Sequence, residues 1–157
     1  MVVKISEISP YRSPEDVLGW LLRLLSALWH RKLNAELAAI DLTEMQFVLL
    51  IGLGWMTPEG ISVSQKDLGQ FCRTSPALTS QVLRSLVRKK LVSVATGAND
   101  TRMRMVLPSK LGEKKLREAI AILQTTDGDF WKDEAETTAR LKTDLLKVIK
   151  TKLAEDP

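Results

Sequence analysis

Apolar residues in the first third of the chain recur every three or four positions, which is the spacing of one face of an α-helix. The residues that follow this spacing are Leu18, Leu21, Leu22, Leu25, Leu28, Trp29, Leu33 and Leu37. Ser13 followed by Pro14 is typical of a helix N-terminus, so we predict that the helix begins there. Trp20 and Leu24 widen the apolar stripe, so this helix has to be covered on more than one side.

A second helix is predicted after Thr43. Thr43 and Gln46 match a capping box, in which each side chain bonds the other residue's backbone N–H. The segment 54–60 contains glycine and proline and ends this helix. The next segment, 61–63, is too short to form a sheet alone but can be an edge strand.

Two further helices are predicted on either side of a tight turn. Ser64 is placed to cap a short helix that turns Leu68 and Phe71 inward. Residues 72–74 form the turn, and the serine and proline at 75–76 begin another helix that runs to about residue 90. Two short helices joined in this way are a helix-turn-helix.

A β-hairpin is predicted next. Apolar and polar residues alternate weakly over 91–96 and clearly over 101–107, as in β-strands. Residues 97–100 between them are of the types that favour turns. In the second strand the residues on one side are Met103, Met105 and Leu107, and those on the other side are Arg102 and Arg104.

Two helices are predicted in the last third of the chain. Ser109 caps the first of them, and its stripe consists of Leu116, Ala119, Ile120 and Leu123. Local propensity weakens at 127–129, where a glycine lies between two aspartates. A final helix is predicted from about Thr137.

A helix-turn-helix followed by a hairpin with arginines near its tip is the arrangement of a winged helix. The second helix of the pair enters the DNA major groove in such folds. At 100° per residue, the apolar residues Leu78, Val82, Leu83 and Leu86 share an inward arc. The opposite face presents Ala77, Ser80, Gln81, Arg84 and Arg88.

These outward side chains have the chemistry of base recognition. Arg84 can contact guanine with two hydrogen bonds, Gln81 can pair with adenine, and Ala77 can meet a thymine methyl group. In the turn, Arg73 and Thr74 are better placed for phosphates, as is either Lys89 or Lys90 at the far end of the helix.

Charge is concentrated in the same part of the chain. The 157 residues carry a formal charge of +4. Residues 62–115 hold eleven basic and three acidic side chains, a balance of +8, whereas residues 1–61 and 116–157 each have a balance of −2. A basic module between acidic ends favours a polyanionic partner, of which double-stranded DNA is the commonest.

Composition excludes several protein classes. With 45% hydrophobic and 27% charged residues, 8 glycines, 6 prolines and 1 cysteine, the chain is neither collagen-like, disordered nor disulfide-rich. The apolar run 17–29 is shorter than the roughly 20 residues of a membrane span and lacks the features of a signal peptide. We therefore expect a cytoplasmic protein without a membrane partner.

The sequence contains few residues that are typical of an enzyme active site. His30 is the single histidine and Cys72 the single cysteine, and they lie far apart in the predicted layout. No phosphate loop, metal-ligand spacing or nucleophile elbow is present, so we expect no catalytic residue, no metal and no cofactor. The alternative to DNA binding is a winged helix that serves as a protein-interaction module. Such a module has no need of groove-reaching arginines.

The chain resembles the MarR family of bacterial winged-helix transcriptional regulators. The matching segments are 42–43, 46–47, 66–69, 78–79, 83–86, 90–92 and 100–102, followed by Gly112. The Asp-x-Arg element at Asp100 and Arg102 is the most specific of them. The resemblance implies an obligate homodimer on a palindromic operator, with Arg102 in the minor groove and Asp100 orienting it.

Three positions depart from the family pattern. Lys90 stands where the family usually has glycine, so we expect a strained or differently capped helix end. The passage 108–112 is one residue longer than usual. The family runs a long helix through 127–129, and we expect that helix to continue here with a bend.

The fold class predicted on these grounds is mainly α with a small β-hairpin wing. Residues 1–12 form an N-terminal arm, residues 13–40 and 109–157 a helical dimerisation region, and residues 41–108 a winged helix-turn-helix lobe. The predicted DNA-binding residues are Arg73, Thr74, Ser75, Pro76, Ala77, Thr79, Ser80, Gln81, Arg84, Arg88, Asp100, Arg102 and Arg104. The function predicted is that of a homodimeric, sequence-specific regulator, usually a repressor in such families.

The resemblance also raises two regulatory alternatives. Many relatives release DNA when a small lipophilic or phenolic anion binds, and the residues placed to line such a site here are Trp20, Arg23, Trp29, His30, Met45 and Trp55. Other relatives sense oxidants through a reactive cysteine. Cys72 lies instead in the helix-turn-helix, although neighbouring Arg73 can lower its pKa.

Overall fold

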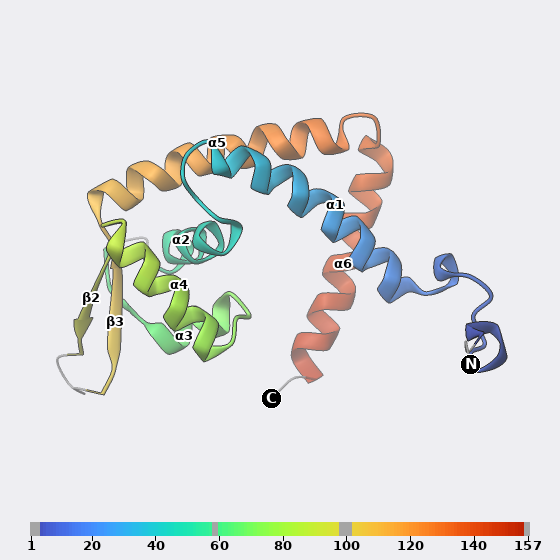
Figure 1. Ribbon diagram of the computed structural model, residues 1–157, viewed down its shortest axis with the longest axis horizontal. Helices are drawn as coiled ribbons and strands as arrows, with labels where there is room; N and C mark the ends of the chain where they lie inside the picture. The colour runs from blue at the N-terminus through green and yellow to red at the C-terminus, as the bar shows by residue number, and fades with distance from the viewer. Residues whose placement is uncertain (1–3, 58–59, 98–101, 156–157) are drawn as a thin grey trace. The chain divides into compact units, whose positions relative to one another are not determined.

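The computed structural model describes residues 4–57, 60–97 and 102–155. Within these ranges the elements are η1 (Ile5–Glu7), η2 (Pro14–Asp16), α1 (Leu18–Ala38), α2 (Glu44–Met56), β1 (Val63–Ser64), α3 (Gln65–Phe71), α4 (Pro76–Arg88), β2 (Val92–Thr96), β3 (Arg104–Pro108), α5 (Lys110–Trp131) and α6 (Ala135–Glu155). Figure 1 shows α2, α3 and α4 gathered beside the hairpin of β2 and β3. The predicted fold class, mainly helical with a small β wing, is confirmed.

The core of this lobe is built on α2. Its Leu49, Leu50 and Leu53 are 1% exposed or less. They lie among buried apolar residues of the neighbouring elements, which are Leu68, Val82, Leu83, Leu86, Leu91, Val92 and Val106. The reciprocal Thr43–Gln46 capping box predicted for the start of α2 is present, with the Thr43 N–H donating to Gln46 Oε1 at 3.1 Å.

The three strands form one antiparallel sheet in the order β1-β3-β2. Val63 pairs with Val106, and Val94 also pairs with Val106 from the other side, so β3 is central and β1 is an edge. The predicted edge strand is therefore confirmed, two residues later than the sequence suggested.

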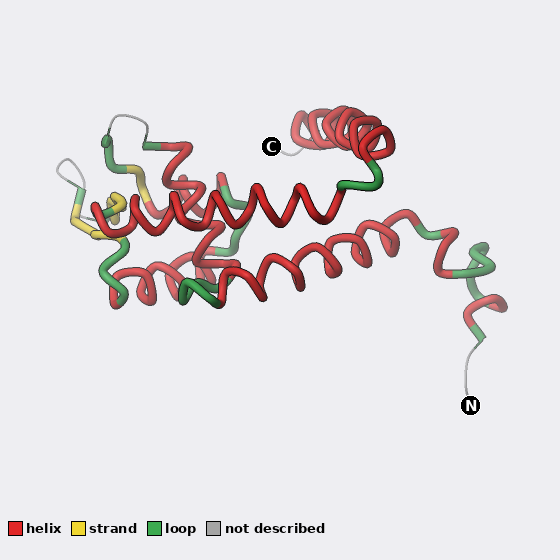
Figure 2. The backbone as a smooth tube through the Cα atoms, turned by 90° about the horizontal axis from the view of Figure 1, so that it is seen from above, coloured by secondary structure: helices red, strands yellow, loops and turns green. Residues whose placement is uncertain are grey.

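The first predicted helix begins later than expected. Ser13 does cap a turn, but it is the short η2, and the Asp16 carboxylate accepts from the backbone N–H groups of Arg12 and Ser13 at 2.8 and 3.0 Å. Val17 is extended, with φ −103° and ψ 100°, and α1 starts only at Leu18. Figure 2 shows α1 from there as one uninterrupted helix.

The helix α5 runs unbroken through 127–129, as the family pattern predicts, and ends at Trp131. A short loop at 132–134 then separates it from α6, visible in Figure 2. The chain divides into two compact units, 1–122 and 123–157, and the division falls within α5. No helix in the described parts of the chain combines the length and hydropathy needed to span a membrane.

Candidate nucleic-acid interface

The helix-turn-helix turn is held by backbone geometry. Arg73 has φ +52°, a left-handed conformation. This lets its own N–H donate to Gln70 O at 3.1 Å and the Thr74 N–H donate to Gly69 O at 2.9 Å, which is the Schellman arrangement at a helix C-terminus. The turn therefore ends α3 at a fixed angle and presents the Arg73 side chain on the surface.

Hydroxyl groups lock α3 against α4. Thr79 is 1% exposed, and its Oγ1 donates to Ser75 O at 2.9 Å and lies 2.7 Å from Thr74 Oγ1. A Cβ on Gly69 would lie 2.8 Å from the same Thr79 Oγ1, so only glycine allows this approach. The expectation that Thr79 contacts DNA is therefore wrong, because its side chain is turned inward to hold the helix pair.

The outward face of α4 agrees with the helical-wheel prediction. Ala77, Gln81, Arg84 and Arg88 are exposed and Ser80 is half-buried. The Arg84 guanidinium donates to Ser80 Oγ at 2.9 Å, which restricts the arginine side chain before any ligand binds. The N-terminus of α4 is capped as predicted, with the Ser75 side chain accepting from the Leu78 N–H.

The second strand of the wing was predicted over 101–107 and instead spans Arg104–Pro108. The second strand begins at Arg104, which is exposed and pairs with Thr96, and Arg102 precedes the strand as an exposed residue. Met103 is 42% exposed, whereas Val106, on the side of Arg104, is fully buried. The methionine side of β3 is thus not the buried side. Asp100 lies outside the described residues.

Two hollows are lined by residues of both the wing and the helix pair. One of about 660 Å³ is lined by Lys66, Gln70, Thr74, Arg102 and Arg104, among others. A second of about 450 Å³ is lined by residues that include Ser80, Gln81, Arg84, Arg88 and Arg104. Gln65 and Arg104 border both hollows, so the arginines of α4 and of the wing face a shared surface.

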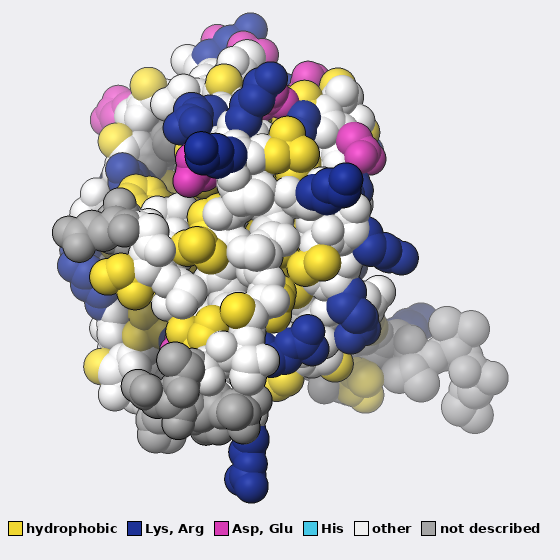
Figure 3. Space-filling view, turned by 90° about the vertical axis from the view of Figure 1, so that its left-hand side faces the viewer, with side chains coloured by type: hydrophobic (Ala, Val, Ile, Leu, Met, Phe, Trp, Pro, Cys, Tyr) yellow, Lys and Arg dark blue, Asp and Glu magenta, His cyan; other side chains and the backbone are white. Residues whose placement is uncertain are grey.

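Basic side chains dominate the part of this surface that lies around the wing and the helix pair. Figure 3 shows that most visible acidic side chains lie in the upper part of the face, whereas the visible charged side chains of the lower part are almost all Lys or Arg. Gln65, Lys66 and Gln70 of α3 also line this surface and were not among the predicted DNA-binding residues. Their position in the first helix of the pair could have indicated them, because this helix crosses the DNA backbone in such folds.

Either Lys89 or Lys90 was expected at a phosphate, and the two side chains differ in the structure. The Lys89 ammonium bonds to the turn between α1 and α2, including Asp41 Oδ1 at 2.9 Å. The neighbouring Lys90 is exposed and has φ +59°. The predicted strain at this position is therefore confirmed, and Lys90 is the lysine whose side chain remains on the surface.

The residues expected to line an effector site are spread over several elements. Trp20 borders a hollow of about 310 Å³, and its companions there come from residues 5–17. Trp29 and His30 meet edge to face at 5.1 Å, and His30 Nδ1 lies 2.5 Å from Glu44 Oε1. Arg23 and Trp55 are exposed, the latter by 72%, and Met45 is half-buried. An effector site at these six residues stays a prediction.

The Cys72 thiol is half-buried at the end of α3. Burial raises the pKa of this thiol, the opposite direction to the effect that Arg73 can have, and Sγ lies 3.5 Å from Val48 O. Phe71, expected inward beside it, is 54% exposed. Among the described residues, no group of His, Cys, Asp and Glu side chains is arranged to hold a metal ion.

Comparison with known proteins places the chain among bacterial regulators. No family model matches the sequence. The chain is 32% identical over 123 residues to the uncharacterized HTH-type transcriptional regulator YdcH of Bacillus subtilis, an alignment that covers 78% of this chain and 84% of the relative.

Solved structures share the fold across nearly the whole chain. A mutant of E. coli MarR complexed with operator DNA has a TM-score of 0.77 and 23% identity, covering 94% of this chain and 99% of that one. The S. aureus MepR–DNA complex has a TM-score of 0.73 and 23% identity over 86% and 98%. A MarR-family regulator from Rhodococcus sp. RHA1 has a TM-score of 0.78 and 16% identity over 88% and 96%. YdcH and the Rhodococcus protein are named as transcriptional regulators.

Proposed function

The chain belongs to the MarR family of winged helix-turn-helix transcriptional regulators, and we propose that it acts as a homodimeric repressor that binds a palindromic DNA operator. The observation that carries the proposal is the exposed face of α4, with Gln81, Arg84 and Arg88, beside the arginines of the wing. Two of the similar solved structures are complexes with DNA. Because its partner is bacterial DNA, we assign the protein to the cytoplasm.

Base recognition is assigned to α4. Arg84 carries the donors for a bidentate contact with guanine, and its bond to Ser80 Oγ at 2.9 Å reduces the rotamer freedom that binding would otherwise remove. Gln81 is exposed one turn from Ala77, so an adenine contact and a thymine-methyl contact can be made on adjacent base pairs.

Phosphate contacts are assigned to the rim of this face. Arg73, Lys66 and Lys90 are exposed cations on the helix-turn-helix, and they would position the lobe without reading sequence. Arg102 and Arg104 on the wing are assigned to the minor groove or its phosphates. The orienting role of Asp100 stays a prediction from the family pattern.

Dimerisation is proposed because apolar surface is left uncovered on the terminal helices. On α1, Leu18, Trp20 and Leu24 are 70%, 51% and 50% exposed. On α6 no described residue is buried, and the half-exposed apolar residues are Leu146, Val148, Ile149 and Leu153. A second copy of the chain would cover these surfaces, since closed two-fold dimers are the commonest oligomers and suit a palindromic site.

The proposal assigns the same functions to the same regions of the chain as the sequence-based prediction. Residues 41–108 are the DNA-binding lobe, residues 13–40 and 109–157 are the dimerisation region, and residues 1–12 are an arm. Release of the DNA by a small lipophilic anion is part of the proposal only as a family property, and no residue is assigned to it.

A pair of variants tests base recognition. Arg84→Ala and Lys66→Ala each remove one exposed cation from the same lobe. We expect Arg84→Ala to weaken operator binding by about 1–3 kcal/mol and to relax base preference at one position of each half-site. Lys66→Ala should weaken binding about equally for all sequences. An unchanged preference profile in Arg84→Ala would contradict the assigned role, and the profiles can be measured by sequencing bound duplexes from a variant pool.

A further inference from the structure

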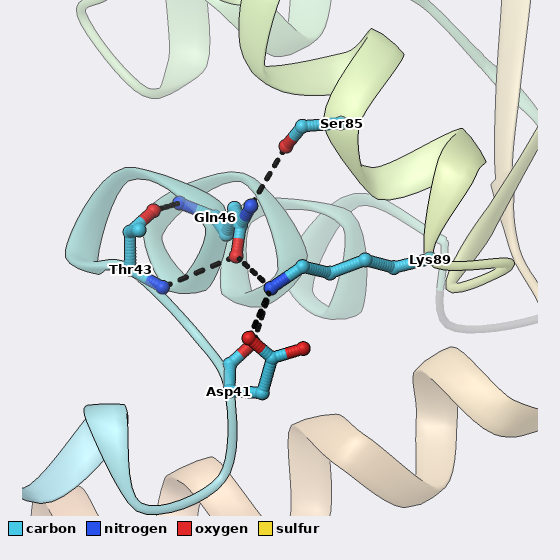
Figure 4. A network of polar contacts seen from close by, with 5 residues as sticks. All are labelled: Asp41, Thr43, Gln46, Ser85 and Lys89. Carbon is cyan, nitrogen blue, oxygen red and sulfur yellow. Dashed lines mark hydrogen bonds and ion pairs between the residues drawn. The ribbon is translucent and has the colours of Figure 1, made fainter.

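The recognition helix α4 is tied to the turn between α1 and α2 by a polar cluster, which we call the corner network. It consists of Asp41, Thr43, Gln46, Ser85 and Lys89 and is drawn in Figure 4. The sequence separations are long, since Lys89 reaches back 48 positions to Asp41 and Gln46 bonds across 39 positions to Ser85. The network therefore joins parts of the chain that no local pattern connects.

All three N–H donors of the Lys89 ammonium group have partners within the network. Its Nζ donates to the backbone carbonyl of Asp41, lies 2.9 Å from Asp41 Oδ1 and donates to Gln46 Oε1 at 3.2 Å. An ammonium group has three donors, so these partners account for all of them. The Lys89 side chain is 29% exposed and that of Asp41 is 88% exposed, so solvent screens the ion pair. The anchor therefore depends on the bonds from Nζ to the Asp41 carbonyl and to the part-buried Gln46 Oε1.

Gln46 occupies the centre of the network and is 6% exposed. Its Nε2 donates to Ser85 Oγ at 2.7 Å, while its Oε1 accepts from the Thr43 N–H at 3.1 Å and from Lys89. Only one orientation of the amide satisfies these partners, because the nitrogen donates and the oxygen accepts. Gln46 thus serves both as the partner of Thr43 in the capping box of α2 and as the link to α4.

The network takes one residue from α4 and one from its C-terminal cap, and the two lie one helical turn apart. Ser85 and Lys89 are at positions i and i+4, so they lie on the same face. Two anchors on one face fix the rotation of a helix about its axis. Arg84 and Arg88 each directly precede an anchor and are therefore turned by about 100° from it, toward the exposed side.

We infer that Lys89 and Gln46 are positioning residues that set the rotation of α4 and thereby aim Arg84 at the base edges. The inference rests on the proposed DNA-binding function and assigns Lys89 a role other than the phosphate contact expected from its charge. A bidentate contact between Arg84 and guanine requires both hydrogen bonds to be aligned. A change in the rotation of α4 would therefore reduce the preference of the protein for its operator over other DNA.

The test compares Lys89→Met with Lys90→Met, two neighbouring changes that remove the same charge. Lys90 is exposed and takes no part in the network, so its variant controls for the lost electrostatic attraction. The DNA sequence that the wild-type protein prefers is first selected from a random pool of duplexes. Affinity is then measured for this operator and for an unrelated duplex of equal length over a series of salt concentrations. Lys90→Met should weaken both by a similar factor and lower the salt slope by about one.

Lys89→Met should reduce the ratio of specific to non-specific affinity roughly tenfold and leave the salt slope unchanged, because hydrogen bonds to a charged group are lost. Lys89→Arg, which keeps the charge and the donors, should restore most of the ratio. A ratio that falls no further in Lys89→Met than in Lys90→Met overturns the inference. So does a salt slope that drops by about one in Lys89→Met.

Amide hydrogen exchange in the DNA-free protein separates this inference from the proposed function. The backbone N–H groups at the end of α4, residues 88–91, should exchange faster in Lys89→Met and in Ser85→Ala than in the wild-type protein, and at the wild-type rate in Lys90→Met. Unchanged exchange in both network variants overturns the positioning role. If the wild-type protein prefers no DNA sequence, the proposed function fails and the exchange rates alone decide whether the network holds α4.

Discussion

Lys90 is a position at which one substitution should make the protein more stable. The Lys90 N–H donates to Val87 O and the Leu91 N–H donates to Leu86 O, both at 2.9 Å, which closes α4 with a Schellman motif. This motif requires the left-handed φ of +59° observed at residue 90. Leu86 and Leu91 are 0% and 3% exposed, so the turn cannot relax without disturbing the core.

The gain expected from Lys90→Gly is the difference between two opposing effects. A residue with a Cβ in the left-handed region costs roughly 1–2 kcal/mol relative to the right-handed one, and glycine avoids this cost. Glycine in turn loses about 0.5–1 kcal/mol more conformational entropy on folding. We therefore expect a net stabilisation of about 0.5–1 kcal/mol.

Urea unfolding followed by circular dichroism measures this gain. Protein concentration is held fixed because stability of a dimer depends on it. The matched control is Lys90→Ala, which removes the same charge but keeps the Cβ and should give no gain. The midpoint should rise in Lys90→Gly with an unchanged slope. Equal midpoints for the glycine and alanine variants would refute the reasoning.

Three other predictions address the DNA contacts, the dimer and the cysteine. Arg102→Ala should lower DNA affinity and reduce the salt slope together, and a salt slope equal to that of the wild-type protein would show that Arg102 does not lie at the phosphates or groove. Ile149→Glu places a charge on the half-exposed apolar stripe of α6 and should weaken self-association at least tenfold in sedimentation experiments. Lys150→Glu, at the exposed neighbouring position, should not weaken it. Equal effects of the two variants would argue against this stripe as the interface. Burial raises the pKa of the Cys72 thiol above its ordinary value of 9.0, so the unfolded chain loses this proton first and the free energy of unfolding should fall as pH rises above about 9. The fall should be smaller in Cys72→Ala, and identical pH profiles from urea unfolding would contradict it.

Local chemistry explains why much of the lobe could be predicted from the sequence. A capping side chain bonds to a backbone group three residues away, so Ser64, Thr43 and Ser75 were recognisable without tertiary information, and all three cap as expected. The inward arc of α4 followed from its period for the same reason, because Val82, Leu83 and Leu86 are buried.

The predictions fail where contacts outside the helical pattern set the direction of a side chain. Thr79 is a small polar residue near the outward face, but its bonds to Thr74 across the turn and to Ser75 O turn it inward. Lys89 resembles any solvent-facing lysine until the turn at Asp41 is folded next to it. Phe71 has helical spacing from Leu68 but lies at the last turn of a short helix, where the core no longer covers it.

Selection of bound sequences from a random pool of DNA duplexes tests the central claim most directly. The proposed homodimer predicts an enriched palindrome whose half-sites are centred about one helical turn apart, bound by two chains per duplex. Absence of any enriched sequence, with the protein folded and the basic face intact, would contradict sequence-specific DNA binding and favour a winged helix that contacts proteins instead.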